Sequence, residues 1–97
     1  MASLEILSPV ANVVEQSVKP APRLRDLGHA TIGLYWNMKA GGDAALDRTE
    51  QLLRERFPGA RFKRYTGSVG WLMRHCTAED ADRIAAEVDA VVGTTND

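Results

Sequence analysis

The sequence predicts an α/β protein in which strands and helices alternate in the order β-α-β-α-β. Three observations support this prediction. Short apolar runs alternate with two longer segments of helical periodicity, glycine or proline punctuates the boundaries, and 97 residues leave room for one hydrophobic core. Strands that alternate with crossover helices pair in parallel, so we expect a parallel sheet between helical layers.

Residues 1–28 are predicted to form an extended N-terminal arm, followed by a single small α/β domain over 29–97. Pro9, Pro20 and Pro22 interrupt any regular period in the arm. The arm nevertheless carries aliphatic side chains suited to burial, namely Ile6, Val10, Val13, Val14 and Val18. We therefore expect it to lie against a surface, either of its own domain or of a partner.

The first strand is predicted at 31–36, a short apolar and aromatic run typical of a strand covered on both faces. A glycine-containing loop leads from it into a helix over 43–57. Side chains recur there at helical spacing: Ala45, Leu46, Thr49, Leu52, Leu53 and Phe57. Pro58 and Gly59 follow, as expected just beyond a helix end.

The second strand is predicted at 60–65, with Phe62 as its inward anchor. Its basic residues make it more polar than the first strand, which favours an edge position. Beyond a loop, Thr77 should cap a second helix, because Asp80 three residues later suits a capping box. The apolar stripe of this helix consists of Ala81, Ile84, Ala85 and Val88.

A third, buried strand is predicted at 90–93. Right-handed crossovers between these elements give a parallel sheet of order 2-1-3, which is a three-layer, Rossmann-like half-domain. The third strand then has no neighbour on one side, although residues 90–92 are apolar enough for a central strand. Something is therefore expected to cover it.

Composition excludes several classes of function. The net charge is -1, with 12 basic and 13 acidic side chains, which argues against nucleic acid or an acidic membrane as partner. The single cysteine, Cys76, excludes an intrachain disulfide and suits a reducing cytoplasm, where we expect the protein to reside. His29 and His75 lack partners at metal-ligand spacing, so neither a metal nor a cofactor is predicted. No signal peptide or membrane span is expected.

Ligands of open parallel sheets bind beyond the carboxyl ends of the strands, where the strand order reverses. With order 2-1-3, this crevice lies between the first and third strands. The predicted substrate-binding residues are those that follow these strands: Asn37, Lys39, Thr94 and Thr95. Lys39 would face a carboxylate or phosphate next to a helix start, which predicts a small anionic substrate. The alternative is a solvated loop lysine and threonines that only end a strand.

Cys76 follows His75 and precedes a predicted helix, an arrangement that can make a thiol reactive. A free cysteine is more often a small buried hydrophobe, and side chains adjacent in sequence rarely face each other. We therefore do not assign a catalytic role to Cys76. Trp36 and Trp71 are interpreted as packing or interface anchors rather than cofactor platforms.

The chain resembles the UGSC-like family, named after a motif that contains selenocysteine or cysteine. The residues that carry the resemblance are Ile6-Leu7-Ser8-Pro9, Ala21-Pro22-Arg23, Ile32-Gly33-Leu34, Asn37-Met38-Lys39, Asp43, the segment 52–60 and Val88-Asp89-Ala90-Val91-Val92. In that family the third strand leads into a Cys/Sec-Gly-Ser-Cys motif, which is expected to hold the nucleophilic or redox atom. No position here matches this motif, and Trp36 replaces the residue that often precedes Asn37.

The resemblance therefore implies a fold and a crevice without assigning a catalytic residue. One hypothesis is a small subunit that completes a heteromeric enzyme, with the cysteine motif on a larger subunit related to the same family. The alternative is a non-catalytic binding or regulatory protein that homodimerises through the third strand. An independent thiol enzyme using Cys76 is a third possibility.

Overall fold

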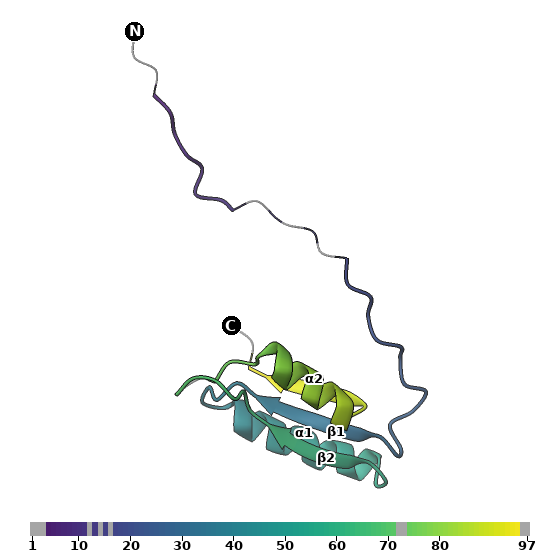
Figure 1. Ribbon diagram of the computed structural model, residues 1–97. Helices are drawn as coiled ribbons and strands as arrows, with labels where there is room; N and C mark the ends of the chain where they lie inside the picture. The colour runs from purple at the N-terminus through teal and green to yellow at the C-terminus, as the bar shows by residue number, and fades with distance from the viewer. Residues whose placement is uncertain (1–3, 12, 14, 16, 72–73, 96–97) are drawn as a thin grey trace.

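The computed structural model describes residues 4–95 except for 12, 14, 16, 72 and 73. Its elements in chain order are β1 (Thr31–Trp36), α1 (Gly42–Arg56), β2 (Arg61–Tyr65), α2 (Ala78–Glu87) and β3 (Ala90–Thr94). The predicted β-α-β-α-β order is confirmed (Figure 1). Neither helix has the length and hydropathy to cross a bilayer, as far as the structure describes the chain.

The strands form one parallel sheet in the predicted order, β2-β1-β3. Leu34 of β1 is in register with Arg64 of β2 on one side and with Val92 of β3 on the other. The central strand is thus β1, and β3 has no neighbour on its outer side among the described residues. β3 runs one residue further than predicted, through Thr94, whose carbonyl accepts a hydrogen bond from Asn37 N at 2.9 Å.

The two helices lie on opposite faces of the sheet (Figure 1). On the α1 side, Ile32 and Leu34 of β1 pack with Leu46 in a core that is almost completely shielded from solvent. On the α2 side, Gly33 leaves room for close packing, because a Cβ there would lie 3.2 Å from the Tyr65 ring and 3.4 Å from Val88. Alternation along β1 therefore sends successive side chains into two different layers.

Helix α1 begins and ends one residue earlier than predicted. It starts at Gly42 after Gly41, which has a φ of 91°, and it stops before Phe57, whose φ and ψ of -130° and 77° are not helical. Its buried face is also narrower than the periodicity indicated, since Leu46 is fully buried whereas Leu52 is 47% exposed. One flank of α1 thus remains open to solvent.

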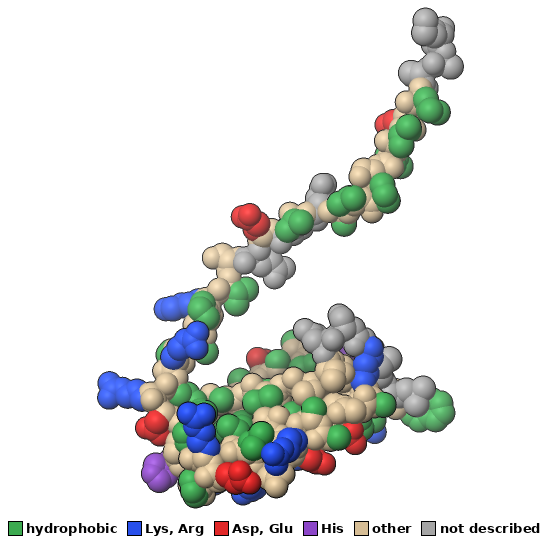
Figure 2. All heavy atoms as spheres, turned by 180° about the vertical axis from the view of Figure 1, so that it is seen from behind, with side chains coloured by type: hydrophobic (Ala, Val, Ile, Leu, Met, Phe, Trp, Pro, Cys, Tyr) green, Lys and Arg blue, Asp and Glu red, His purple; other side chains and the backbone are tan. Residues whose placement is uncertain are grey.

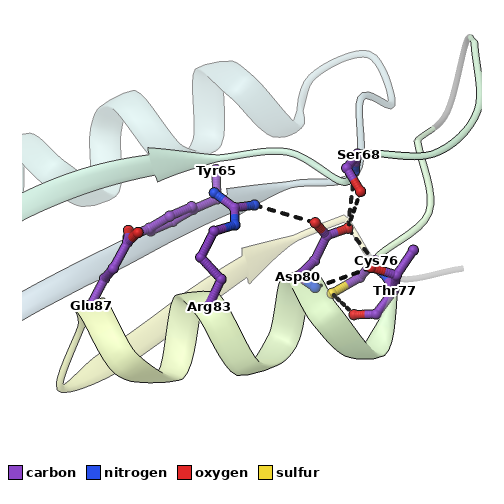
Figure 3. A network of polar contacts seen from close by, with 7 residues as sticks. All are labelled: Tyr65, Ser68, Cys76, Thr77, Asp80, Arg83 and Glu87. Atoms are coloured by element: carbon purple, nitrogen blue, oxygen red, sulfur yellow. Dashed lines mark hydrogen bonds and ion pairs between the residues drawn. The ribbon is translucent and has the colours of Figure 1, made fainter.

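Helix α2 begins with the predicted capping box. The Thr77 hydroxyl accepts a hydrogen bond from Asp80 N at 3.0 Å, and the Asp80 carboxylate accepts one from Thr77 N at 3.0 Å (Figure 3). The same carboxylate also accepts hydrogen bonds from the Ser68 amide at 3.0 Å and from the Ser68 hydroxyl at 2.8 Å. Asp80 thereby fastens the β2–α2 loop to the start of α2.

Removing the cap should be measurable. We expect Thr77→Ala to cost about 1 kcal/mol, or roughly 4–8 °C in Tm, because the amide of Asp80 loses its acceptor. Thermal unfolding followed by circular dichroism measures this effect. Thr49→Ala, which removes a mid-helix hydroxyl bonded to Ala45 O, is the control and should cost nothing. Equal Tm values for the two variants would contradict the role given to the cap.

The N-terminal arm does not pack on its own domain. Every described residue from 4 to 26 is exposed, and the arm projects away from the sheet and helices (Figure 1). Its large aliphatic side chains are 77–90% exposed: Leu4, Ile6, Leu7, Val10, Val13 and Val18. Val14 lies outside the described residues. We expected the arm to lie against its own domain or against a partner, and the described residues of the arm do not lie against their own domain.

Candidate functional site

The loop that follows β1 is held in one conformation by contacts with its own backbone. The Trp36 indole N–H donates to Lys39 O at 2.7 Å, and Lys39 N donates to the Asn37 side-chain oxygen at 3.1 Å. Met38 adopts a left-handed φ of 71°, which turns the chain sharply between these two residues. The backbone of Lys39 is therefore fixed beside Asn37.

Asn37 ties the end of β1 to the end of β3. Its side-chain oxygen accepts a hydrogen bond from Thr95 N at 3.1 Å, and its amide nitrogen donates to Thr95 O. Thr94 is held in turn, because its hydroxyl donates to Gly42 O at 2.8 Å. Three of the four predicted site residues thus lie together, and the side chains of Asn37 and Thr94 hold the strand ends in place.

Glycine is required at the start of α1 because the helix there lies very close to the ends of β1 and β3. A Cβ on Gly42 would lie 2.8 Å from Cδ1 of Trp36 and 2.9 Å from the Thr94 hydroxyl oxygen. The amino end of α1 therefore reaches the carboxyl end of β3 directly. This contact places the start of α1, the positive end of the helix dipole, beside the predicted crevice.

A shallow hollow of about 320 Å³ lies at the carboxyl ends of β1 and β3. It is lined by Tyr35, Asn37, Gly93, Thr94 and Thr95. This is the position at which the strand order reverses and where the sequence predicted a crevice. Lys39 is half-buried nearby but is not among the described residues that line the hollow. Residues 96 and 97, which follow Thr95, lie outside the described residues.

Tyr35 lines the hollow but was not predicted from the sequence. It also lines a neighbouring apolar groove of about 290 Å³, together with Cys76, Ala81, Ile84, Ala85 and Val91. Burial, followed by the charge and hydrogen bonding of the adjacent Cys76 side chain, raises the pKa of Tyr35 above its ordinary value. Tyr35 therefore remains a neutral hydroxyl at physiological pH. The sequence feature that could have identified Tyr35 is its position near the carboxyl end of a predicted buried strand.

Cys76 is exposed, in contrast to the buried position usual for a free cysteine. Its thiol donates to Thr77 O at 3.7 Å at the start of α2 (Figure 3). Neither His29 nor His75 belongs to a group that could hold a metal, because no cluster of three or more His, Cys, Asp or Glu occurs among the described residues. Trp36 packs against the core as predicted, whereas Trp71 is 87% exposed.

Charged residues outside the crevice form surface pairs. Tyr65 donates to Glu87 at 2.5 Å, and Lys63 lies 3.7 Å from the same carboxylate. The Tyr65 hydrogen bond, helped by the nearby Lys63 and opposed by desolvation, lowers the pKa of Glu87. Arg64 instead pairs with Asp47 of α1 at 2.8 Å. The Lys63–Glu87 and Arg64–Asp47 contacts are solvated ion pairs, which contribute little to stability individually.

Comparison with protein-family models matches residues 5–97 to the UGSC family. The match covers nearly the whole sequence, so the chain belongs to the UGSC family. It confirms the resemblance found in the arm, the loop after β1 and the third strand. Neither the curated proteins nor the solved structures gave a significant match.

Proposed function

We propose that this UGSC-family chain is a small subunit of a heteromeric enzyme and forms one wall of its active-site crevice. A larger subunit related to the same family would supply the Cys/Sec-Gly-Ser-Cys motif and with it the nucleophilic or redox atom. This chain would contribute Asn37, Lys39, Thr94 and Thr95, which bind and orient a small anionic substrate.

The observation that carries this proposal is the fixed junction between β1 and β3. Asn37 holds Thr95 by hydrogen bonds to both of its backbone polar groups, directly beside a hollow at the switch point of the sheet. In the resembling family the cysteine motif follows this third strand. A motif brought to this edge would meet a rigid wall, and rigid positioning is what a reacting thiol or selenol requires.

The residues of this wall suit an anionic group. Lys39 carries a positive charge on a loop whose backbone is fixed, and the amino end of α1 adds backbone N–H groups and the positive end of the helix dipole. Tyr35 also lines the hollow and adds an aromatic surface to this wall. These groups bind and orient the substrate, while bond formation takes place at the motif of the larger subunit.

Affinity purification of the tagged full chain from its native host tests the proposal. We expect a polypeptide containing Cys/Sec-Gly-Ser-Cys to co-purify, identified by mass spectrometry after thiol alkylation. Thr95→Arg, which places a bulky side chain at the hollow, should reduce its recovery, whereas Ala44→Arg on the exposed side of α1 should not. Recovery of no motif-bearing polypeptide would refute the subunit function and leave a non-catalytic binding protein.

The charge of Lys39 should matter for turnover of the assembled enzyme. We expect Lys39→Met to lower kcat/KM by roughly 10- to 150-fold, equivalent to about 1.5–3 kcal/mol for a hydrogen bond to a charged group. Lys63→Met, which removes an exposed lysine paired with Glu87, is the control and should have little effect. Steady-state kinetics of the purified complex provides the measurement.

Cys76→Ser should leave the same activity within a few-fold of the parent, because the chemistry is assigned to the other subunit. Full activity in Lys39→Met together with loss of activity in Cys76→Ser would reverse the assignment. That result would favour an independent thiol enzyme built on Cys76.

A further inference from the structure

The two outer strands of the sheet differ in how they are protected against a further strand. β2 carries Arg61, Lys63 and Arg64, and charged side chains on an edge strand oppose pairing with another chain. β3 has the sequence AVVGT, with no charge, no proline and no bulge. The outer edge of β3 is therefore the one suited to association.

An apolar groove runs beside this edge on the α2 face of the sheet. Its lining side chains are Tyr35, Cys76, Ala81, Ile84, Ala85 and Val91. The alanines of α2 are small and exposed, and Val91 of β3 is 51% exposed. Small side chains on the helix and a projecting valine on the strand leave a channel that an extended apolar segment can enter.

The chain itself contains such a segment. The described residues between 4 and 26 form an extended arm. Its first part is rich in exposed aliphatic side chains, and its second part, 19–25, carries Lys19, Arg23 and Arg25 (Figure 2). Helix α2, which borders the groove, exposes Glu79, Asp82 and Glu87 against the single basic residue Arg83. The arm and the groove are thus both apolar, and the basic part of the arm is opposite in charge to the acidic helix α2.

The exposed area shows how much surface the extended arm leaves open for contact. The chain exposes 8322 Å², whereas a compact monomer of 10.6 kDa exposes about 5,500 Å². The difference is several times the ~800 Å² that each partner contributes to a standard interface. The radius of gyration, 19.2 Å, likewise exceeds the value of about 12–13 Å expected for a compact chain of this length.

We propose that two copies of this chain associate by exchanging arms, so that apolar side chains from the arm, residues 4–18, of one copy enter the groove between α2 and β3 of the other. The basic stretch 19–25 then lies along the acidic helix α2 of the second copy. About 20 extended residues span on the order of 65 Å, enough to reach across a neighbouring domain. This inference is independent of the proposed function, which uses the carboxyl edge of the sheet.

A disulfide-mapping experiment tests the exchange, because the native Cys76 lines the groove. A tagged chain carrying Leu7→Cys and Cys76→Ser is mixed with the untagged wild type and oxidised with diamide. Each mixed disulfide then joins an arm thiol of one copy to a groove thiol of the other. We expect it to form roughly a hundred-fold faster than with a control chain carrying Ala44→Cys and Cys76→Ser, because docking raises the effective thiol concentration to the millimolar range.

Sedimentation of the full chain provides the second part of the test. We expect a dimer at micromolar concentration that becomes monomeric in Val91→Lys and after deletion of residues 1–18, with the circular dichroism of the folded domain retained. Leu52→Lys, a matched change at an exposed apolar residue of α1, should remain dimeric. Dissociation should increase with salt, because the charged contacts are screened.

Two outcomes would overturn the inference. A monomeric wild type whose arm thiol crosslinks no faster than the control would exclude docking of the arm in the groove. A monomeric chain in which Leu7→Cys alone forms a fast intramolecular disulfide with Cys76 would show that the arm closes on its own domain. Neither outcome depends on whether a motif-bearing polypeptide co-purifies.

Discussion

Asn37→Ala is expected to lower kcat of the assembled enzyme roughly a hundred-fold, the loss typical of a reacting group misplaced by about 1 Å. The substitution removes both hydrogen bonds to Thr95 and the one to Lys39 N, so the end of β3 is no longer held beside the loop. Asn37 acts here as a positioning residue, and steady-state kinetics measures its effect.

Asn37→Asp is the informative second variant. It keeps acceptors for Lys39 N and Thr95 N but loses the donor to Thr95 O, so it should recover part of kcat. A purely structural role would lower activity only in proportion to the fall in Tm, whereas we expect kcat to fall far more than the lowered Tm accounts for. Wild-type kcat in Asn37→Ala would show that the junction between β1 and β3 does not position the reaction.

Asp80→Asn should cause the largest loss of stability among substitutions of charged residues. The carboxylate is 4% exposed and accepts hydrogen bonds from Thr77 and Ser68, which hold its pKa well below the ordinary value. The bonds from Thr77 and Ser68 all end on one carboxylate oxygen, while the other oxygen accepts from Arg83 at 3.3 Å. An amide can keep the first set only with an uncharged oxygen, and it then turns an N–H donor toward Arg83. We expect Tm to fall by more than the roughly 4–8 °C predicted for loss of the Thr77 hydroxyl alone.

The pH dependence of stability follows from the direction in which folding shifts the pKa of Asp80. Because the pKa of Asp80 is lower in the folded chain, its carboxylate contributes full stability above the unfolded pKa of about 3.9, and this contribution is lost as the pH falls below it. The Tm of the wild type should therefore decrease below about pH 4, and less so in Asp80→Asn. Asp82→Asn, at an exposed position of α2, should retain the wild-type acid dependence. Identical acid profiles for wild type and Asp80→Asn would contradict this role.

Most of the fold could be predicted because it rests on local patterns. The apolar run of β1, the spacing of Leu46 and Leu53 in α1 and the Thr77 capping box each act within a few residues. The differences occur where backbone geometry decides, as at Gly41, whose left-handed φ starts α1 one residue early, and at Phe57, which leaves the helical region. Such geometry does not follow from hydrophobic periodicity.

The candidate site was only partly predictable, because its contacts join distant parts of the chain. Strand order alone located the crevice and brought Asn37 together with Thr94 and Thr95. The hydrogen bonds between Asn37 and Thr95 link positions 58 residues apart, and no local sequence pattern predicts them. Ser68, which the sequence did not single out, is recruited by Asp80 in the same way. Lys39 stays a predicted substrate-binding residue.

The most direct measurement of the central claim is a photocrosslink from the crevice itself. Thr95 is replaced by benzoylphenylalanine in the tagged chain, the native host is irradiated, and the crosslinked peptides are sequenced by mass spectrometry, with the same probe at Ala44 as control. We predict that position 95, and not position 44, is joined to a peptide containing the Cys/Sec-Gly-Ser-Cys motif. Crosslinks from position 95 only to other copies of this chain, or to peptides without the motif, would contradict the shared crevice.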